Sequence, residues 1–319
     1  MENLKEIGGY FGMEELPGKE YYEDLTALNL GRTALLHLLA QRNYTEILLP
    51  YYLCDSVISA CRSLNMKVSF YHLDENLIPQ TGVLPENACL YLVNYYGQLT
   101  DEKILEYKKK YKRILVDHTH AFYQRPLKTV DTIYSCRKFF GLPDGAYLSA
   151  EHVTADALPE DFSASRMEHI LGRYEKGGHA YYDVMLKNAA SFHEEVPRRM
   201  SRLTHNLLRG INYKACAEKR SRNYDVLASV LSNSNPLPFV KPEVPMCYPY
   251  YTADGLKIRA ALARQKIYVP VYWKNVTETM PENSIEYRYA SNILPLPCDQ
   301  RYSEEDMKRI LTVLQSLHC

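Results

Sequence analysis

Over residues 30–149 the chain alternates short apolar runs with amphipathic segments, and this alternation constrains the fold more than any other feature. The apolar runs predict strands at 46–49, 68–71, 89–93, 114–116 and 132–135. The segments between them predict helices at 33–41, 55–64 and 101–112. Strands joined by helical crossovers run parallel, so the pattern predicts a mostly parallel sheet between two layers of helices. A run at 146–148, after a Pro-Asp-Gly turn, is expected to pair with this sheet.

The second half of the chain has a different pattern. Residues 160–232 are expected to be mainly helical, and a Pro-Leu-Pro sequence at 236–238 then interrupts the pattern. Beyond it we expect a helix at 255–265, strands at 267–269 and 293–294, and a last helix at 303–317. These elements predict a smaller α+β domain, with 1–215 forming the large domain and 216–319 the small one.

Composition argues against several classes of protein. Lysine and arginine together number 38, as do aspartate and glutamate, and no long basic block occurs, so we expect no nucleic-acid partner. No apolar run reaches the ~20 residues that a membrane span needs, and residues 1–6 contain no apolar signal region. We therefore expect no membrane association and a cytoplasmic location.

The cysteine pattern supports the same location. None of the cysteines forms a Cys-x-x-Cys pair, and none has the His/Cys spacing of a metal site. Reduced thiols and no bound metal are therefore expected, as in cytoplasmic proteins. The eight cysteines stand at positions 54, 61, 89, 136, 216, 247, 298 and 319.

Polar side chains follow the predicted strands at the points where those strands end. Asn94 and Asp117 each end a strand, and Ser135 ends another, with Lys138 three residues later. Ligands of open α/β sheets bind outside the carboxyl ends of the strands. A lysine amine that forms a Schiff base, with a carboxylate that keeps a ring nitrogen protonated, is what pyridoxal phosphate (PLP) requires. A solvated lysine and a helix-capping aspartate remain the alternatives for these two residues.

The start of the first predicted helix is a candidate phosphate site. Gly31 and Arg32 lie where free backbone amides and the positive end of the helix dipole bind anions, and Thr33 adds a hydroxyl. A plain capped helix start is the alternative. The chain contains no Gly-x-Gly-x-x-Gly, no Walker loop and no Gly-x-Ser-x-Gly, which argues against dinucleotide, P-loop and serine-hydrolase chemistry.

Taken in order, these motifs resemble those of the DegT-type sugar aminotransferases, PLP enzymes with the aspartate aminotransferase fold. The resemblance covers residues 25–150 and 255–315. It implies a three-layer α/β/α large domain, PLP as cofactor, an amino acid donor, a keto acceptor such as a keto sugar or nucleotide-linked keto sugar, and a homodimer. The matching segments are 31–35, Pro50, 94–98, 116–121, Ser135 with Lys138, 144–145, 294–297 and 302–307.

The resemblance also implies roles for single residues. Lys138 would carry the cofactor and move the substrate proton, Asp117 would face the ring nitrogen, and His120 would lie beside the ring's phenolic oxygen. Cys54 occupies the place of the aromatic residue that usually stacks on the ring, so Tyr51 or Tyr52 is expected to replace it. The residues expected to hold the phosphate are Gly31, Arg32, Thr33 and Ser135.

Two departures from the family pattern leave alternatives open. Ser135 and Lys138 are closer together than the family usually shows, and its Gly-x-Asn-x-Arg stretch is missing, so another segment must reach the phosphate across the dimer. A PLP-dependent lyase or dehydratase, or a non-catalytic sensor or structural relative, would also fit, although an intact Lys138 argues against the sugar dehydratases. Trp273 is expected in the substrate cleft or the core. The candidates for the missing stretch are Arg198, Arg199, Ser201, Thr204 and Asn206.

Overall fold

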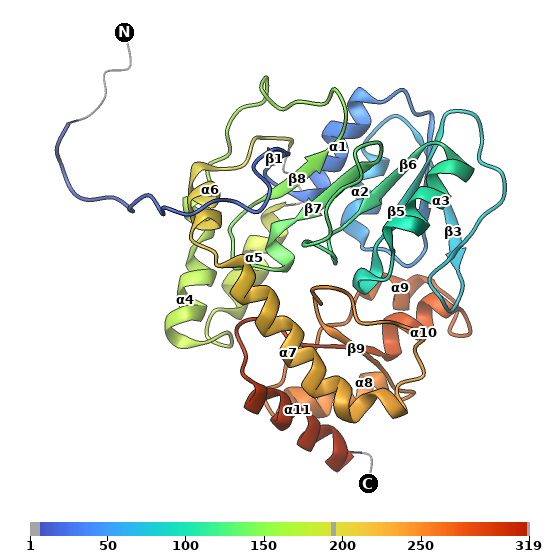
Figure 1. Cartoon of the computed structure of the whole chain (residues 1–319), viewed down its shortest axis with the longest axis vertical. Helices are drawn as coiled ribbons and strands as arrows, with labels where there is room; N and C mark the ends of the chain where they lie inside the picture. Colours follow the sequence, from blue (N-terminus) through green and yellow to red (C-terminus); the bar gives the residue numbers. More distant parts are fainter. Residues whose placement is uncertain (1–6, 193–195, 318–319) are drawn as a thin grey trace.

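A single eight-stranded sheet lies at the centre of the upper part of the molecule (Figure 1) in this computed structural model, which describes residues 7–192 and 196–317. Its strand order is β1-β8-β7-β6-β5-β2-β3-β4. Strands β2, β3, β5, β6 and β7 run parallel, whereas β1, β4 and β8 are antiparallel to their neighbours. The strands are β1 (Thr26–Leu28), β2 (Glu46–Pro50), β3 (Lys67–Leu73), β4 (Pro79–Gln80), β5 (Ala88–Val93), β6 (Ile114–Asp117), β7 (Asp131–Ser135) and β8 (Ala146–Ser149).

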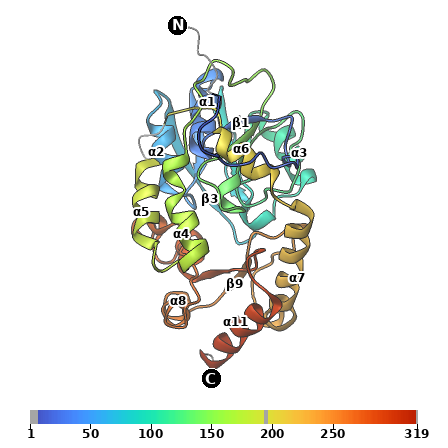
Figure 2. The ribbon, with the colours of Figure 1, turned by 90° about the vertical axis from the view of Figure 1, so that its left-hand side faces the viewer.

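Helices cover both faces of this sheet. In Figure 2, α1 and α2 lie on one side of the strands and α3 lies on the other. Every residue of β2, β5 and β6 is buried, as expected for parallel strands covered on both faces. The three-layer large part and its mostly parallel sheet are therefore confirmed, including the pairing of 146–148. The helices of this half of the chain are α1 (Gly31–Gln41), α2 (Asp55–Arg62), α3 (Asp101–Tyr111), α4 (Glu168–Lys176), α5 (Tyr182–Ser191) and α6 (Arg202–Arg209).

The C-terminal part is smaller and combines helices with a two-stranded sheet. Strand β9 (Tyr248–Tyr251) pairs antiparallel with β10 (Ile293–Leu296), and a second apolar cluster that includes Leu227, Leu262 and Met307 joins this sheet to the helices. The smaller α+β part is therefore confirmed. Its helices are α7 (Tyr213–Leu231), α8 (Gly255–Arg264), α9 (Lys274–Thr279), α10 (Ile285–Asn292) and α11 (Glu304–Leu317).

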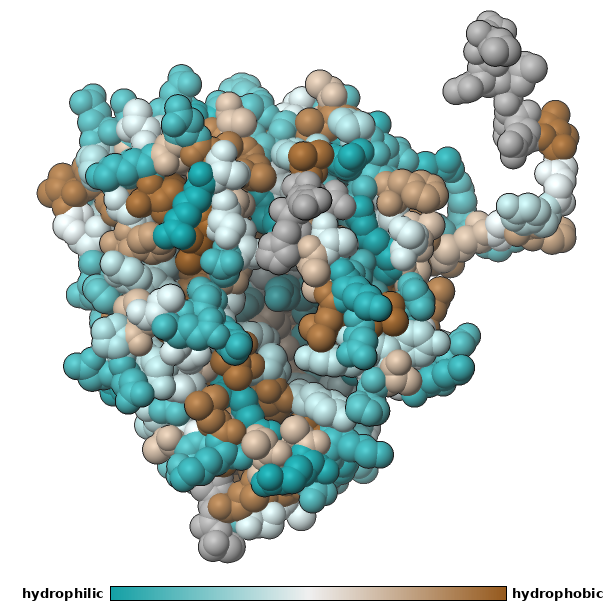
Figure 3. All heavy atoms as spheres, turned by 180° about the vertical axis from the view of Figure 1, so that it is seen from behind, coloured by the Kyte–Doolittle hydropathy of each residue, from teal (hydrophilic) through white to brown (hydrophobic). Residues whose placement is uncertain are grey.

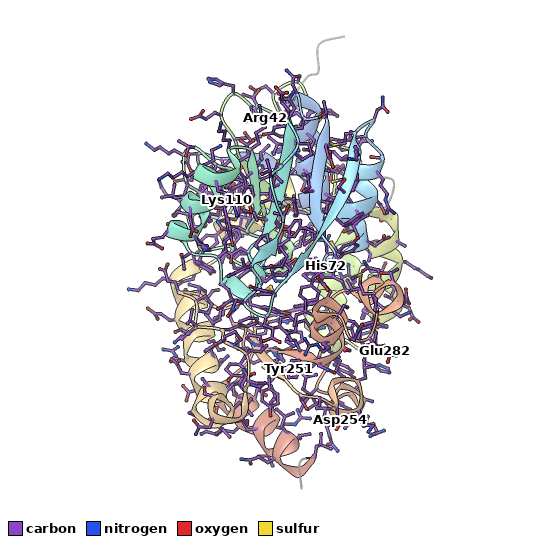
Figure 4. The ribbon with its side chains drawn as sticks, turned by 90° about the vertical axis from the view of Figure 1, so that its right-hand side faces the viewer. Arg42, His72, Lys110, Tyr251, Asp254 and Glu282 are labelled. Atoms are coloured by element: carbon purple, nitrogen blue, oxygen red, sulfur yellow. The ribbon has the colours of Figure 1, made fainter. Side chains whose placement is uncertain are left out.

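The two parts pack against each other along the lower end of the sheet. Figure 4 shows His72 at the end of β3, next to the C-terminal part that holds Tyr251. Glu286 of α10 accepts hydrogen bonds from His72 Nδ1 and from the Leu73 N–H, both at 3.0 Å. The main apolar cluster also extends from the large part to Ile293. The boundary between 215 and 216 therefore remains a prediction, since α7 spans it.

One predicted strand is wrong. Residues 267–269 form a loop, in which the Ile267 N–H donates to the Leu262 carbonyl at the end of α8. The Ile267 side chain is buried in the second apolar cluster, Tyr268 is exposed, and Pro270 follows directly. A β-branched, aromatic run has strand propensity, but burial of one side chain at the helix end decides its structure here.

Some expectations concern residues that the structure does not describe. The signal-region prediction for residues 1–6 and the state of Cys319 lie outside the described residues. Among the described helices, none combines the length and the apolar character that a membrane crossing requires.

Candidate active site

The predicted site residues converge at the carboxyl ends of β6 and β7. Asp117 ends β6, Ser135 ends β7, and Lys138 ends the 3₁₀ turn η2 (Cys136–Lys138) that follows. These strands are direct neighbours, with Asp117 opposite Ile133. The start of α1 lies against the same edge, because a Cβ built on Gly31 would be 3.7 Å from Ser135 Cβ. Residues more than a hundred positions apart in sequence thus meet at one place.

Lys138 is exposed to solvent, although many protein atoms lie around its amine. Desolvation lowers the pKa of Lys138, Cys54 and Asp117 favour the charged amine, and Arg137 and Arg32 oppose it. A larger share of this amine is therefore neutral, and able to attack a carbonyl, than of a surface lysine at the same pH.

Asp117 is a buried carboxylate held in a fixed orientation. It accepts hydrogen bonds from Tyr91 Oη at 2.7 Å and from the Thr119 N–H at 2.8 Å. Desolvation raises the pKa of Asp117, while these hydrogen bonds and the charge of Lys138 act in the opposite direction. A buried carboxylate of this kind is ready to pair with a protonated ligand nitrogen.

His120 is buried and stacks on Trp273, with ring centroids 5.8 Å apart and planes within 5° of parallel. Desolvation, with a smaller contribution from the charge of Lys138, lowers the pKa of His120 to about 3. The imidazole is therefore neutral at physiological pH. The Tyr96 N–H points at Nδ1 from 3.5 Å, which favours the tautomer with a hydrogen-bond donor at Nε2.

An aromatic wall faces these polar groups. Tyr52 and Tyr95 stack on each other, and both meet the ring of Trp273 edge-on. Tyr96 and Trp273 have φ angles of 54° and 45°, which are costly for residues with large side chains and are found mainly at functional sites. The structure thus places Trp273, from the C-terminal part, beside His120 at the candidate site.

The start of α1 differs from the expectation in one respect. The Thr33 hydroxyl lies 2.5 Å from Asn29 Oδ1 and accepts from the Leu30 N–H, so it stabilises the helix start from inside the protein. Arg32 donates from Nη1 to the Phe192 carbonyl at 3.3 Å, and desolvation lowers its pKa. Gly31 and Arg32 supply the first amides of α1 beside Ser135, and the phosphate role of Thr33 stays a prediction.

Sequence reasoning missed two residues of this region. Tyr91 lies inside an apolar strand, and only the pairing of β5 with β6 brings its hydroxyl to Asp117. Arg137 lies over the Phe192 ring, and its buried Nε has no hydrogen-bond partner within the described residues. Burial lowers the pKa of Arg137 to about 10, and Arg32 adds repulsion. This unpaired donor could bind an anion. In the sequence, Arg137 is simply the neighbour of Lys138, and nothing there indicates this role.

The residues predicted to reach across a dimer have partners within this chain. Ser201 donates to the buried carboxylate of Asp144, and Thr204 donates to the same group. Asn206 donates to the Glu14 carbonyl at 2.8 Å. Arg199 similarly donates from Nε to the Leu158 carbonyl. A role for them in a neighbouring subunit therefore remains a prediction, as does one for Arg198.

Seen from behind, the molecule has a recess near the middle of the face (Figure 3). Phe192 directly precedes the undescribed residues 193–195, and both Arg32 and Arg137 contact it. Within residues 7–192 and 196–317, no group of three or more His, Cys, Asp or Glu side chains is placed to hold a metal ion.

Known structures share this architecture. DesV of S. venezuelae, in complex with a ketimine intermediate, is 17% identical over 92% of this chain and 84% of its own, with a TM-score of 0.63. The putative sugar aminotransferase Spr1654 of Streptococcus pneumoniae, in its PMP form, is 15% identical over 91% and 86%, with a TM-score of 0.63. A DegT DnrJ EryC1 StrS aminotransferase of Brucella abortus is 14% identical over 93% and 86%, with a TM-score of 0.59. No protein-family model and no curated protein matches the chain.

These likenesses define the class of fold. The chain has the fold of these sugar aminotransferases over more than nine tenths of its length. The fold predicted from the ordered motifs is therefore confirmed. The DegT DnrJ EryC1 StrS aminotransferase of Brucella abortus is among the proteins that share this fold.

Proposed function

We propose that the protein is a PLP-dependent aminotransferase that moves an amino group from an amino acid to a keto acceptor, with a keto sugar or nucleotide-linked keto sugar as the acceptor. One observation carries the proposal. A lysine amine with a lowered pKa, a buried carboxylate and the first amides of a helix meet at the ends of β6 and β7, in a fold that sugar aminotransferases share.

The residues present fit PLP. Asp117, held by Tyr91, would keep a proton on a ring nitrogen, and the amides of Gly31 and Arg32, beside Ser135, would bind a phosphate. The orphaned Nε of Arg137 adds a donor for an anion. When bound, PLP supplies an electron-withdrawing ring that stabilises negative charge on a substrate carbon.

The chain's own residues then have distinct tasks. Lys138, whose pKa is lowered by desolvation, would hold the cofactor through Nζ and, once freed, would take a proton from the substrate at Nζ and return it. Asp117 would be ionised beside the protonated ring nitrogen and would keep the proton on that nitrogen. His120 would donate from Nε2 to an acceptor oxygen, because the Tyr96 N–H points at its Nδ1 and leaves the proton of the neutral ring on Nε2. Trp273, which packs against Tyr52 and Tyr95, covers the ring of His120.

Borohydride trapping tests the cofactor assignment. The protein is incubated with PLP, reduced with borohydride and digested, and the labelled peptide is identified by mass spectrometry. We expect the label on Lys138 and its loss in Lys138→Ala. Lys19→Ala, which changes an exposed lysine paired with Glu23, is the matched control and should keep the label. A label on another lysine contradicts the assignment.

A substrate screen tests the reaction. Each amino acid is mixed with the PLP-loaded protein, and conversion to the pyridoxamine form is followed by absorbance. Keto sugars and nucleotide-linked keto sugars are then offered to the converted protein. Return of the original absorbance with a keto sugar supports the proposal. Release of ammonia or water from the substrate without that return would instead indicate a lyase or a dehydratase.

A homodimer in the cytoplasm completes the proposal. Residues 7–13 extend away from the body of the molecule (Figure 1), and Ile7, Tyr10 and Phe11 are each 97% exposed. Tyr174 of α4 is 92% exposed, so apolar surface is available for a second copy. The seven described cysteines are unpaired, which supports a reducing compartment. Light scattering that finds a fully active, PLP-loaded monomer contradicts the dimer.

A further inference from the structure

Arg220, on α7, is buried in an unusual way. Its side chain is 2% exposed, and its guanidinium is surrounded by oxygen atoms of neutral groups. Nε donates to Gln300 Oε1 at 2.7 Å, Nη1 donates to the carbonyls of Pro245 and Met246 at 3.1 Å each, and Nη2 donates to the Phe139 carbonyl at 3.0 Å. The same group lies 4.5 Å from the centre of the Phe139 ring.

Burying a cation on neutral partners is costly, and an apolar side chain of similar volume would fill the space at lower cost. The Asp299 charge favours the charged form of Arg220, but this carboxylate makes its own paired hydrogen bonds to Arg301. The need to fill this space therefore does not explain why an arginine occupies position 220. Its planar set of donors matches several fixed carbonyls at once, which a lysine cannot do.

The carbonyl that Arg220 holds belongs to the residue directly after Lys138. Gln300 Nε2 donates to the same Phe139 carbonyl at 2.8 Å. Two donors from elements far away in the sequence thus fix one peptide at the end of the turn that carries Lys138. Pro245 and Met246 lead into strand β9, so the same guanidinium also holds the C-terminal part.

We propose that Arg220 is a positioning residue: by fixing the Phe139 peptide to the C-terminal part, it sets where the Lys138 amine lies. This inference rests on the proposed function, because the position of Lys138 matters through the cofactor it would carry. A displaced amine meets the reacting atoms less often, and misplacement by about 1 Å can slow a reaction ~100-fold. It also has different neighbours, so the pH at which a group carried on Nζ titrates changes.

The test uses Arg220→Lys in the full-length, PLP-loaded protein. Lysine keeps the charge but not the planar donors. We expect a ~10–100-fold lower single-turnover rate with any accepted amino donor, little change in KM, and a shifted pH midpoint for the absorbance band of bound PLP. A purely structural role would lower the melting temperature without moving this midpoint.

Arg259→Lys is the matched control. Arg259, on α8, is 7% exposed and likewise donates to backbone carbonyls, those of Ser291 and Ile293, but these belong to the C-terminal part alone. A midpoint shift in Arg220→Lys, absent in Arg259→Lys at an equal loss of melting temperature, supports the proposal. Equal shifts in both variants, or none in either, overturn it.

A second variant keeps the proposal testable if Arg220→Lys does not fold. Gln300→Ala removes the other donor to the Phe139 carbonyl, and a midpoint shift in the same direction supports the proposal, whereas an unchanged midpoint overturns it. Borohydride labelling of the wild type distinguishes failure of the proposed function from failure of the Arg220 inference. No borohydride label on Lys138 overturns the proposed function together with this inference, whereas normal labelling without any variant shift overturns only the inference.

Discussion

The two sides of the candidate site differ in chemistry. The side formed by β6, β7 and the start of α1 carries charged and hydrogen-bonding groups, above all Lys138 and Asp117. The opposite side, formed by Tyr52, Tyr95 and Trp273, is aromatic and takes its tryptophan from the C-terminal part. The first side contains the atoms that can react, and the second contains none that can act as an acid or base at neutral pH.

The aromatic side nevertheless affects the charged one. Desolvation is the largest cause of the pKa shifts of Lys138, Asp117 and His120 alike. Each shift favours the neutral form, as burial in a medium of low dielectric does. Trp273, from the C-terminal part, stacks on His120 and helps to bury it, so the aromatic side contributes to the desolvation of that imidazole. Each prediction below changes one side of this pair.

The largest effect is expected for Lys138→Ala, which removes the only amine placed at the ends of β6 and β7 within the described residues. Activity should fall at least ~10⁴-fold, since removing a covalent catalyst costs this much or more in other enzymes. Far-UV circular dichroism should stay unchanged. Activity within tenfold of the wild type would mean that the charged side does not carry the chemistry.

Asp117→Asn should have the next largest effect. A neutral amide does not hold a proton on a ring nitrogen, so the single-turnover rate should fall on the order of 10²–10⁴-fold. Because burial raises the pKa of Asp117, the ionised group costs stability above its ordinary pKa of 3.8. The variant without cofactor should therefore unfold at an equal or higher temperature than the wild type at pH 7. A faster or unchanged rate contradicts the assigned role.

The residues on the charged side were predictable because of how parallel sheets are built. Strands covered on both faces appear as continuous apolar runs, and the first polar residue after a run marks the edge where ligands bind. Asp117 and Ser135 follow such runs directly. Their roles in binding a cofactor remain predictions, while the fold that brings them together is confirmed.

Residues that support the site through long-range contacts were less predictable. Tyr91 and Arg220 act through hydrogen bonds that span 26 and 81 positions of the chain, and no local pattern encodes such contacts. Local pattern also failed at 267–269, where burial of Ile267 at the end of α8 overrides strand propensity. Trp273 was expected in the cleft or the core, and the packing of its loop against Tyr52 decided its place.

Acid should destabilise the protein through His120. Its folded pKa of about 3 lies below the ordinary value of 6.5, so the neutral form contributes stability above pH 6.5 that is lost as the pH falls toward 3. Between pH 6.5 and 5 the loss amounts to about 2 kcal/mol. In urea unfolding, the free energy of unfolding of His120→Gln should fall by about 2 kcal/mol less than that of the wild type over this pH range. His118, whose pKa burial also lowers to about 3, remains in both proteins.

The smallest effect is expected for Trp273→Leu, which tests whether the aromatic side does more than pack. Loss of its stacking on His120 should cost about 0.5–1.5 kcal/mol of stability. Tyr51→Leu is the matched control, because Tyr51 stacks on Phe70 at 5.1 Å. If Trp273 excludes water from Lys138, only its variant should raise the pH midpoint of the bound-cofactor absorbance band. Equal midpoints in the two variants would reduce the role of Trp273 to packing, and the contrast between the two sides would then rest on the charged residues alone.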